Sequence, residues 1–102
     1  MEYTIKPHVS GVFRSLLELR WFVWFRQQTS AVQYVGHVDT WRDFVVQGQS
    51  IEIKPQGIGD LVSIQDAVQA RVPDGSQLDL YVGAPDSHRC FALRNGVWHG
   101  VS

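Results

Sequence analysis

The stretch HRCFALRNGVWHGV, residues 88–101, places two apolar-rich segments on either side of Asn95-Gly96. Asn-Gly is the favoured pair for a type I′ turn, because both central residues of that turn need a positive φ. A two-residue turn also fixes the pairing of the flanking segments, so we expect Leu93 to face Trp98. The stretch therefore predicts a β-hairpin, and with it a sheet that is at least partly antiparallel.

The segment before this hairpin extends the same sheet. Residues 77–82 alternate polar and apolar side chains, with Leu78, Leu80 and Val82 on the inward side. Strict alternation is typical of a strand with one buried face. We therefore predict a three-stranded meander.

Residues 60–72 carry the clearest helical pattern in the chain. Ile64 and Val68 recur at helical spacing, Asp60 can cap the first turn, and Pro73 stops the helix. We expect this helix to pack on one face of the sheet.

The first half of the chain is dominated by five large apolar residues, WFVWF at positions 21–25. From residue 17 to residue 25 every odd position is apolar, whereas a helical wheel of the same residues has no polar face. The period of two predicts a strand over residues 17–27 with apolar side chains on both faces.

The remaining segments are shorter and complete the expected fold. Residues 10–16 are interpreted as a short helix or a loop. The sum is a single compact α+β domain over residues 1–102, a small mostly antiparallel β-sheet with one main helix packed on a face. Further strands are expected at residues 3–7, 31–38, 44–47 and 50–54.

Composition bounds the class of protein. The 102 residues are 44% apolar and 19% charged, as in an ordinary globular domain. Nine Lys and Arg stand against ten Asp and Glu and are scattered, so the basic stripe of a nucleic-acid-binding protein is missing. A lone cysteine, Cys90, fits a reducing compartment. With neither a signal-peptide pattern nor an apolar run of membrane-spanning length, we expect a cytoplasmic protein without nucleic-acid or membrane partners.

Aromatic residues are the main candidates for a binding surface. A strand over residues 17–27 would present Phe22 and Trp24 on a second apolar face, which a single-layered sheet cannot hide. Aromatic and Arg side chains dominate the binding energy of such surfaces. The tryptophans could instead line an apolar pocket, with His37, Arg42 or Tyr81 as orienting polar groups. The candidate ligand or interface residues are Trp21, Phe22, Trp24, Trp41, Arg42, Tyr81 and Trp98.

Catalytic residues are not expected, because no complete constellation is visible. His37 and Asp39 would share a strand face, so that the carboxylate could orient the imidazole, and His99 could act as a second proton-transfer group. These three residues are the only catalytic candidates. They need a common cleft, and neither a nucleophile nor a lysine accompanies them.

Metal and cofactor sites are not expected either. His88 and Cys90 alternate on one strand, but close-spaced ligand pairs such as C-x-x-C or H-x-x-x-H are missing. The stretch GIGD at positions 57–60 lacks the Lys-Ser/Thr of phosphate-binding loops, and its aspartate would repel an anion.

Three functional hypotheses follow. The first is a non-enzymatic binding or assembly module, a homo-oligomer joined through the aromatic strand, with a possible pocket for a small apolar ligand. The second is an inhibitor or immunity-type protein that masks a protein partner, which converging acidic residues would support. The third is a small hydrolase built on the two histidines. The acidic residues in question are Asp39, Asp43, Asp60, Asp66, Asp74, Asp79 and Asp86.

Overall fold

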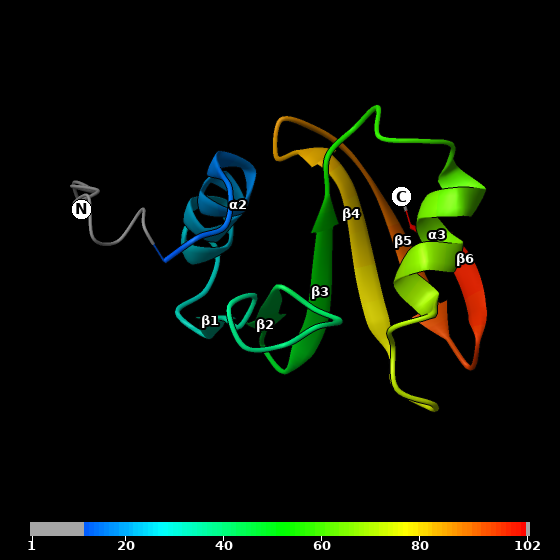
Figure 1. The fold of residues 1–102 in the computed structure, drawn as a ribbon. Coiled ribbons are helices and arrows are strands. Elements are labelled where there is room, and N and C mark those ends of the chain that lie inside the picture. The colour runs from blue at the N-terminus through cyan, green and yellow to red at the C-terminus, as the bar shows by residue number, and fades with distance from the viewer. Residues whose placement is uncertain (1–11, 102) are drawn as a thin grey trace.

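The computed structural model describes residues 12–101 as a six-stranded sheet with a helix packed on each face (Figure 1). The strands lie in the order of the sequence, and all neighbours are antiparallel except β3 and β4. This is the predicted α+β architecture with a mostly antiparallel sheet, and it has a second helix. The elements are α2 (Leu16–Arg26), β1 (Val32–Tyr34), β2 (Phe44–Val46), β3 (Gln49–Lys54), α3 (Leu61–Gln69), β4 (Leu78–Ala84), β5 (Ser87–Arg94) and β6 (Val97–Val101).

The predicted hairpin is confirmed in its turn and in its register. Asn95 and Gly96 both have positive φ, 52° and 76°, as a type I′ turn requires. Leu93 faces Trp98 across β5 and β6, and β4 pairs with β5 to complete the meander. The predicted strands at 44–47 and 50–54 match β2 and β3 to within a residue. The strand expected at residues 3–7 lies outside the described residues.

The helix expected over 60–72 is α3, and it forms the crossover between the parallel strands β3 and β4. The Asp60 side chain caps its first turn by accepting a hydrogen bond from the Ser63 backbone N–H at 3.2 Å. Ile64 and Val68 are buried against the inward side chains of β4, as the spacing predicts. The helix ends a turn earlier than expected, at Gln69.

The strand predicted over residues 17–27 is wrong, because this segment is the helix α2. Ser15 caps the helix by accepting from the Glu18 backbone N–H at 3.2 Å. The absence of a polar face, which argued against a helix, has a tertiary cause: α2 is packed on several sides. Trp21 and Phe25 are buried against the sheet, and Phe22 contacts Phe13 on another side. Residues 12–15, in the segment expected to be a helix or a loop, form the turn before α2.

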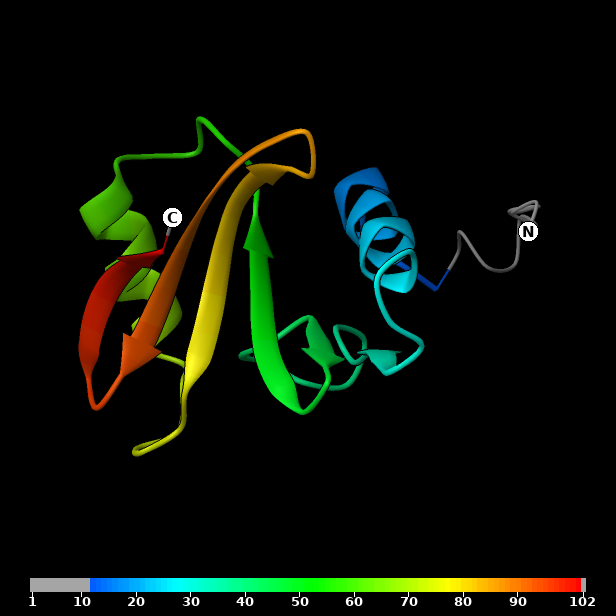
Figure 2. The same cartoon turned by 180° about the vertical axis from the view of Figure 1, so that it is seen from behind.

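The two helices cover opposite faces of the sheet. Leu80 and Val82 of β4 point to α3, whereas Tyr81 between them points to the α2 side with Ile51 and Ile53 of β3. Figures 1 and 2 show α3 beside β5 and β6, and α2 beside the other end of the sheet. The α2-side face of β5 and β6 is therefore left partly open.

The strand expected at 31–38 is short, and the chain turns after Tyr34. The Val35 carbonyl accepts from the backbone N–H groups of Val38 and Asp39 at 3.0 and 2.8 Å, which closes a turn over residues 35–39. His37 consequently lies in a turn and not on a strand. Within residues 12–101 no helix is long and apolar enough to cross a membrane.

Candidate functional site

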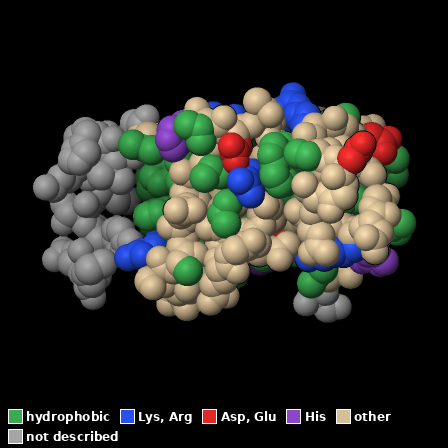
Figure 3. All heavy atoms as spheres, turned by 90° about the horizontal axis from the view of Figure 1, so that it is seen from below, with side chains coloured by type: hydrophobic (Ala, Val, Ile, Leu, Met, Phe, Trp, Pro, Cys, Tyr) green, Lys and Arg blue, Asp and Glu red, His purple; other side chains and the backbone are tan. Residues whose placement is uncertain are grey.

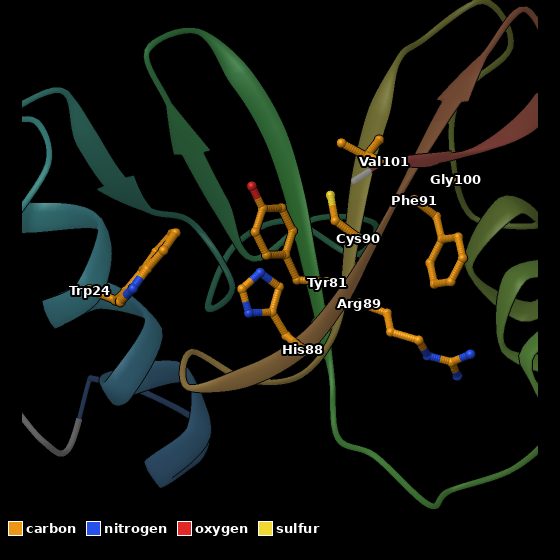
Figure 4. Close-up of a pocket in the computed structure, with 8 residues that line it drawn as sticks. All are labelled: Trp24, Tyr81, His88, Arg89, Cys90, Phe91, Gly100 and Val101. Carbon is orange, nitrogen blue, oxygen red and sulfur yellow. The ribbon is translucent and has the colours of Figure 1, made fainter.

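A groove between α2 and the β4–β5 hairpin brings aromatic and polar side chains together. Its volume is about 710 Å³. Figure 4 shows the Trp24 indole from α2 approaching Tyr81 of β4 and His88 of β5, which lie side by side. We call this cavity the Trp24–His88 groove. It is lined by Trp24, Tyr81, His88, Arg89, Cys90, Phe91, Gly100 and Val101.

Trp21 fixes the wall of the groove from inside the protein. Its side chain is 0% exposed, and its indole Nε1–H donates to the Gly83 carbonyl oxygen at 2.9 Å. Its ring meets Tyr81 edge to face at 4.8 Å and His88 at 4.9 Å. Because α2 is bonded to β4 at this point, Trp24, one turn further along the helix, is held over the groove.

Gly83 is required where β4 and β5 turn beside the groove. Its φ is +112°, and a Cβ atom built on it would lie 2.5 Å from the Ser87 carbonyl oxygen. Both the backbone conformation and the space therefore demand glycine. Gly83 is the register partner of His88, so this close approach also sets the position of the imidazole.

The His88 imidazole has a defined orientation. It stacks on Tyr81 with ring centroids 5.5 Å apart and planes inclined by 20°, and its Nδ1 lies 3.1 Å from the Pro85 carbonyl oxygen. A carbonyl oxygen can only accept, so Nδ1 carries the proton, and Nε2 of the neutral ring is an acceptor. The groove thus offers one positioned acceptor among aromatic walls.

The Tyr81 hydroxyl and the Cys90 thiol of this wall both favour their neutral forms. Burial, and then the neighbouring Cys90 and Asp79, raise the pKa of Tyr81 to about 12. Burial, and then Asp79, raise the pKa of the Cys90 thiol. A protonated thiol is a weak nucleophile.

The groove lies where β6 ends and β5 continues. Val101 pairs with Cys90, so the β5 residues before Cys90 extend past the end of β6. Arg89 and Phe91 point to the opposite face of β5 from the other lining residues (Figure 4). The Arg89 guanidinium lies 5.6 Å from the centre of the Phe91 ring.

The structure brings together three of the seven predicted binding residues. Trp21, Trp24 and Tyr81 form one aromatic cluster, in which Trp21 is buried support and the other two line the groove. Phe22 does not join them. It packs on Phe13 with ring centroids 5.2 Å apart.

The other predicted binding residues belong to the α3 side of the molecule. Trp41 and Trp98 pack against the hydrophobic core under α3, and the Trp98 indole donates to the Gln69 side chain at 3.1 Å. The Arg42 guanidinium lies 4.6 Å above the Trp41 ring and pairs with Asp39 at 2.6 Å. The four tryptophans therefore do not line one pocket, as the sequence suggested they could.

His37, Asp39 and His99 are not assembled into a catalytic group. His37 stacks on Tyr34, and Asp39 binds Arg42 instead of the imidazole. His99 lies on β6, the opposite edge strand of the sheet from β1. The cavity beside His37 is lined by Arg14, Gly36, Val38, Asp39, Thr40 and Arg71, and His99 does not reach it.

A second polar cluster lies beneath the start of α2 and has a structural role. Glu18 accepts hydrogen bonds from the Tyr34 hydroxyl at 2.8 Å and from the Arg14 side chain at 3.1 Å. The Arg14 guanidinium also contacts the buried Asp43, whose other oxygen accepts from the Ile53 backbone N–H at 2.9 Å. These bonds tie α2 to β1, β2 and β3.

Glu52, buried beside this cluster, is the most strongly perturbed carboxyl group in the described part of the chain. Burial, and then a hydrogen bond and charge repulsion from Asp43, raise the pKa of Glu52 to about 8. Lys54 lies 3.6 Å away and opposes that shift. Burial and the neighbouring Asp43 therefore favour the protonated form of Glu52.

The acidic residues do not converge on one surface. Asp43 is buried, and three others, Asp39, Asp79 and Asp86, are paired with arginines. On the face drawn in Figure 3 the acidic and basic side chains are interspersed. Among residues 12–101, no three His, Cys, Asp or Glu side chains are grouped so that they could hold a metal ion.

Sequence reasoning missed the central role of His88 and Gly83. The available signal was the alternation of His88 and Cys90 on one strand. It places both side chains on the same face of the sheet as Gly83 and Tyr81, with which they pair. That face became one wall of a groove because α2 is a helix that lies beside it and brings Trp24 within 5.9 Å of His88. No protein-family model, curated protein or solved structure shows a significant match to this chain.

Proposed function

We propose that this protein is a non-enzymatic binding module, and that the Trp24–His88 groove holds a small, flat, largely apolar molecule. The observation that carries the proposal is the convergence of Trp24, Tyr81 and His88 on one cavity of about 710 Å³. Ligand pockets commonly have volumes of about 300–1,000 Å³ and combine aromatic walls with a few placed polar groups.

The chemistry of the walls defines the ligand class. Tyr81 and His88 offer the faces of two stacked rings, and Trp24 offers an indole, so a planar molecule gains the most contact. His88 Nε2 accepts a hydrogen bond, so the ligand carries one N–H or O–H donor at its edge. The charged groups near this wall, Asp79 and Arg94, are paired with each other at 2.9 Å.

Indole is a suitable first probe, because it is planar, apolar and has a single N–H donor. In a titration followed by ¹⁵N–¹H NMR we expect indole to shift the amide signals of residues 88–90 and the Trp24 side-chain signal. 1-Methylindole has the same shape without the donor. It should bind about three- to tenfold more weakly, as expected from the loss of one hydrogen bond.

Two variants distinguish the contribution of the aromatic wall from that of the His88 hydrogen-bond acceptor. Trp24→Ala should remove binding of both probes, whereas His88→Ala should weaken indole and abolish its advantage over 1-methylindole. His37→Ala is the matched control, since His37 also stacks on a tyrosine at 5.5 Å but lies outside the groove. The proposal is refuted if indole at about 5 mM leaves the groove signals unmoved, or if Trp24→Ala binds as the wild type does.

A further inference from the structure

The outer edge of β6 is unpaired among residues 12–101, and we propose that two copies of this chain associate there, β6 against β6, about a two-fold axis at His99. β6 is the last strand in the sheet order, and Figures 1 and 2 show no described element beyond it. This inference is independent of the groove and its ligand.

The composition of the edge favours pairing. Natural sheets protect an exposed edge with lysine, proline, a bulge or a very short strand. β1, at the other edge, has three residues, but β6 has five, Val-Trp-His-Gly-Val, without a formal charge or a proline. Val97 and Val101 are 55% and 49% exposed.

The direction of the backbone groups fixes which residues could bond to a partner. In a two-residue hairpin the residues that flank the turn are hydrogen-bonded to each other, and bonded and non-bonded pairs then alternate. Val97, His99 and Val101 therefore bond to β5. The N–H and C=O groups of Trp98 and Gly100 point outward, which gives about four hydrogen bonds to a second strand.

The outward pattern is self-complementary in one antiparallel register. When His99 faces His99 of the second copy, Val97 faces Val101, and Trp98 faces Gly100. Valine then pairs with valine on one side of the sheet. On the other side Trp98, whose indole is packed against α3 of its own copy, faces a glycine, which offers no side chain that could clash with it. A two-fold interface uses the same surface on both copies, and this strand satisfies that condition.

The strand edge alone buries less area than a standard stable interface, so the dimer is weak. We expect a dissociation constant of about 10–100 µM at pH 8. Sedimentation equilibrium of the full chain should show the dimer over that range. A monomer at about 1 mM would overturn the proposal, whether the edge stays bare or is covered by residues outside 12–101.

Two single-residue variants test the β6 edge without destabilising the monomer. Gly100→Pro removes an outward N–H, which an edge strand tolerates, and should weaken association at least tenfold. Gly100→Ala keeps that N–H, and a Cβ at this position meets no atom within 4 Å, so it serves as the matched control. Equal association of the two variants would exclude the proposed bonds.

A disulfide trap tests the register. In a Cys90→Ser background, His99→Cys should form a covalent dimer on mild oxidation, because a central non-bonded pair brings the two Cβ atoms close. Val62→Cys, at an exposed position on α3, is the control for random collision. Equal rates of cross-linking would refute the two-fold axis at His99.

The central histidine pair also predicts a pH dependence. Like charges directly opposite each other repel, so association should be about five- to tenfold weaker at pH 5 than at pH 8. Arg94 and Cys90 on β5 share the face of His99, and Asp79 on β4 pairs with Arg94 at 2.9 Å. His99→Gln should associate equally at both pH values; the same pH dependence in that variant would contradict the arrangement.

Discussion

Replacing Trp21 by phenylalanine tests the link between α2 and the sheet. The indole is 0% exposed and donates to the Gly83 carbonyl oxygen at 2.9 Å. Loss of that bond costs about 0.5–1.5 kcal/mol. The smaller ring also leaves a void in a core packed on all sides, for a further cost of about 1–2 kcal/mol. We expect a total loss of about 1.5–3.5 kcal/mol in the free energy of unfolding.

Trp98→Phe is the matched control for this prediction. It deletes the same N–H, which donates to Gln69 at 3.1 Å, from an indole that is only half-buried. Its loss should be about 1 kcal/mol. Urea denaturation followed by far-ultraviolet circular dichroism gives both values without relying on tryptophan fluorescence. Equal losses, or a larger loss for Trp98→Phe, would refute the view that Trp21 anchors α2.

Two further predictions concern a proton and a glycine. Because the pKa of Glu52 is about 8 in the folded protein and 4.5 is the ordinary value, the folded state binds this proton more tightly, and stability should fall as the pH rises from about 5 to about 8. Glu52→Gln should flatten that fall and be the more stable protein at pH 9, as measured by urea denaturation; parallel pH curves would contradict this. Gly83→Ala should lower stability by about 2 kcal/mol or more, whereas Gly57→Ala, with a φ of +86° and open space, should cost about 1 kcal/mol. Thermal unfolding compares the two glycine variants, and equal costs would show that the contact with the β5 backbone is unimportant.

The second half of the fold could be predicted because its signals are local. Asn95-Gly96 fixes a turn by its backbone preference, and the alternation of Leu78, Leu80 and Val82 fixes a buried face. The helix α3 has an N-terminal cap, and its apolar residues lie on one side, which packs on the sheet. Each of these features can be read from a few neighbouring residues.

The helix α2 could not be predicted because its signals depend on tertiary contacts, although β2 and β3 of the same half were predicted. The apolar residues of α2 face several directions because the sheet, the segment before the helix and the β4–β5 hairpin each contact a different side of it. Periodicity cannot distinguish such a buried helix from a strand apolar on both faces. The groove was missed for the same reason: Tyr81 was a candidate, but its stacking with His88 under Trp24 requires knowing where α2 lies.

The order of the strands has a consequence for how the chain folds. Every strand pairs with the next strand along the chain. The helix α3 separates β3 from β4, and no other helix lies between neighbouring strands of the described residues. Most strand pairs therefore form by closing a short loop, which costs little chain entropy. Topologies of low contact order fold quickly, and the β4–β5–β6 meander, with its preset turn, is the natural nucleus. We therefore expect α2, which packs against partners far along the chain, to dock late in folding.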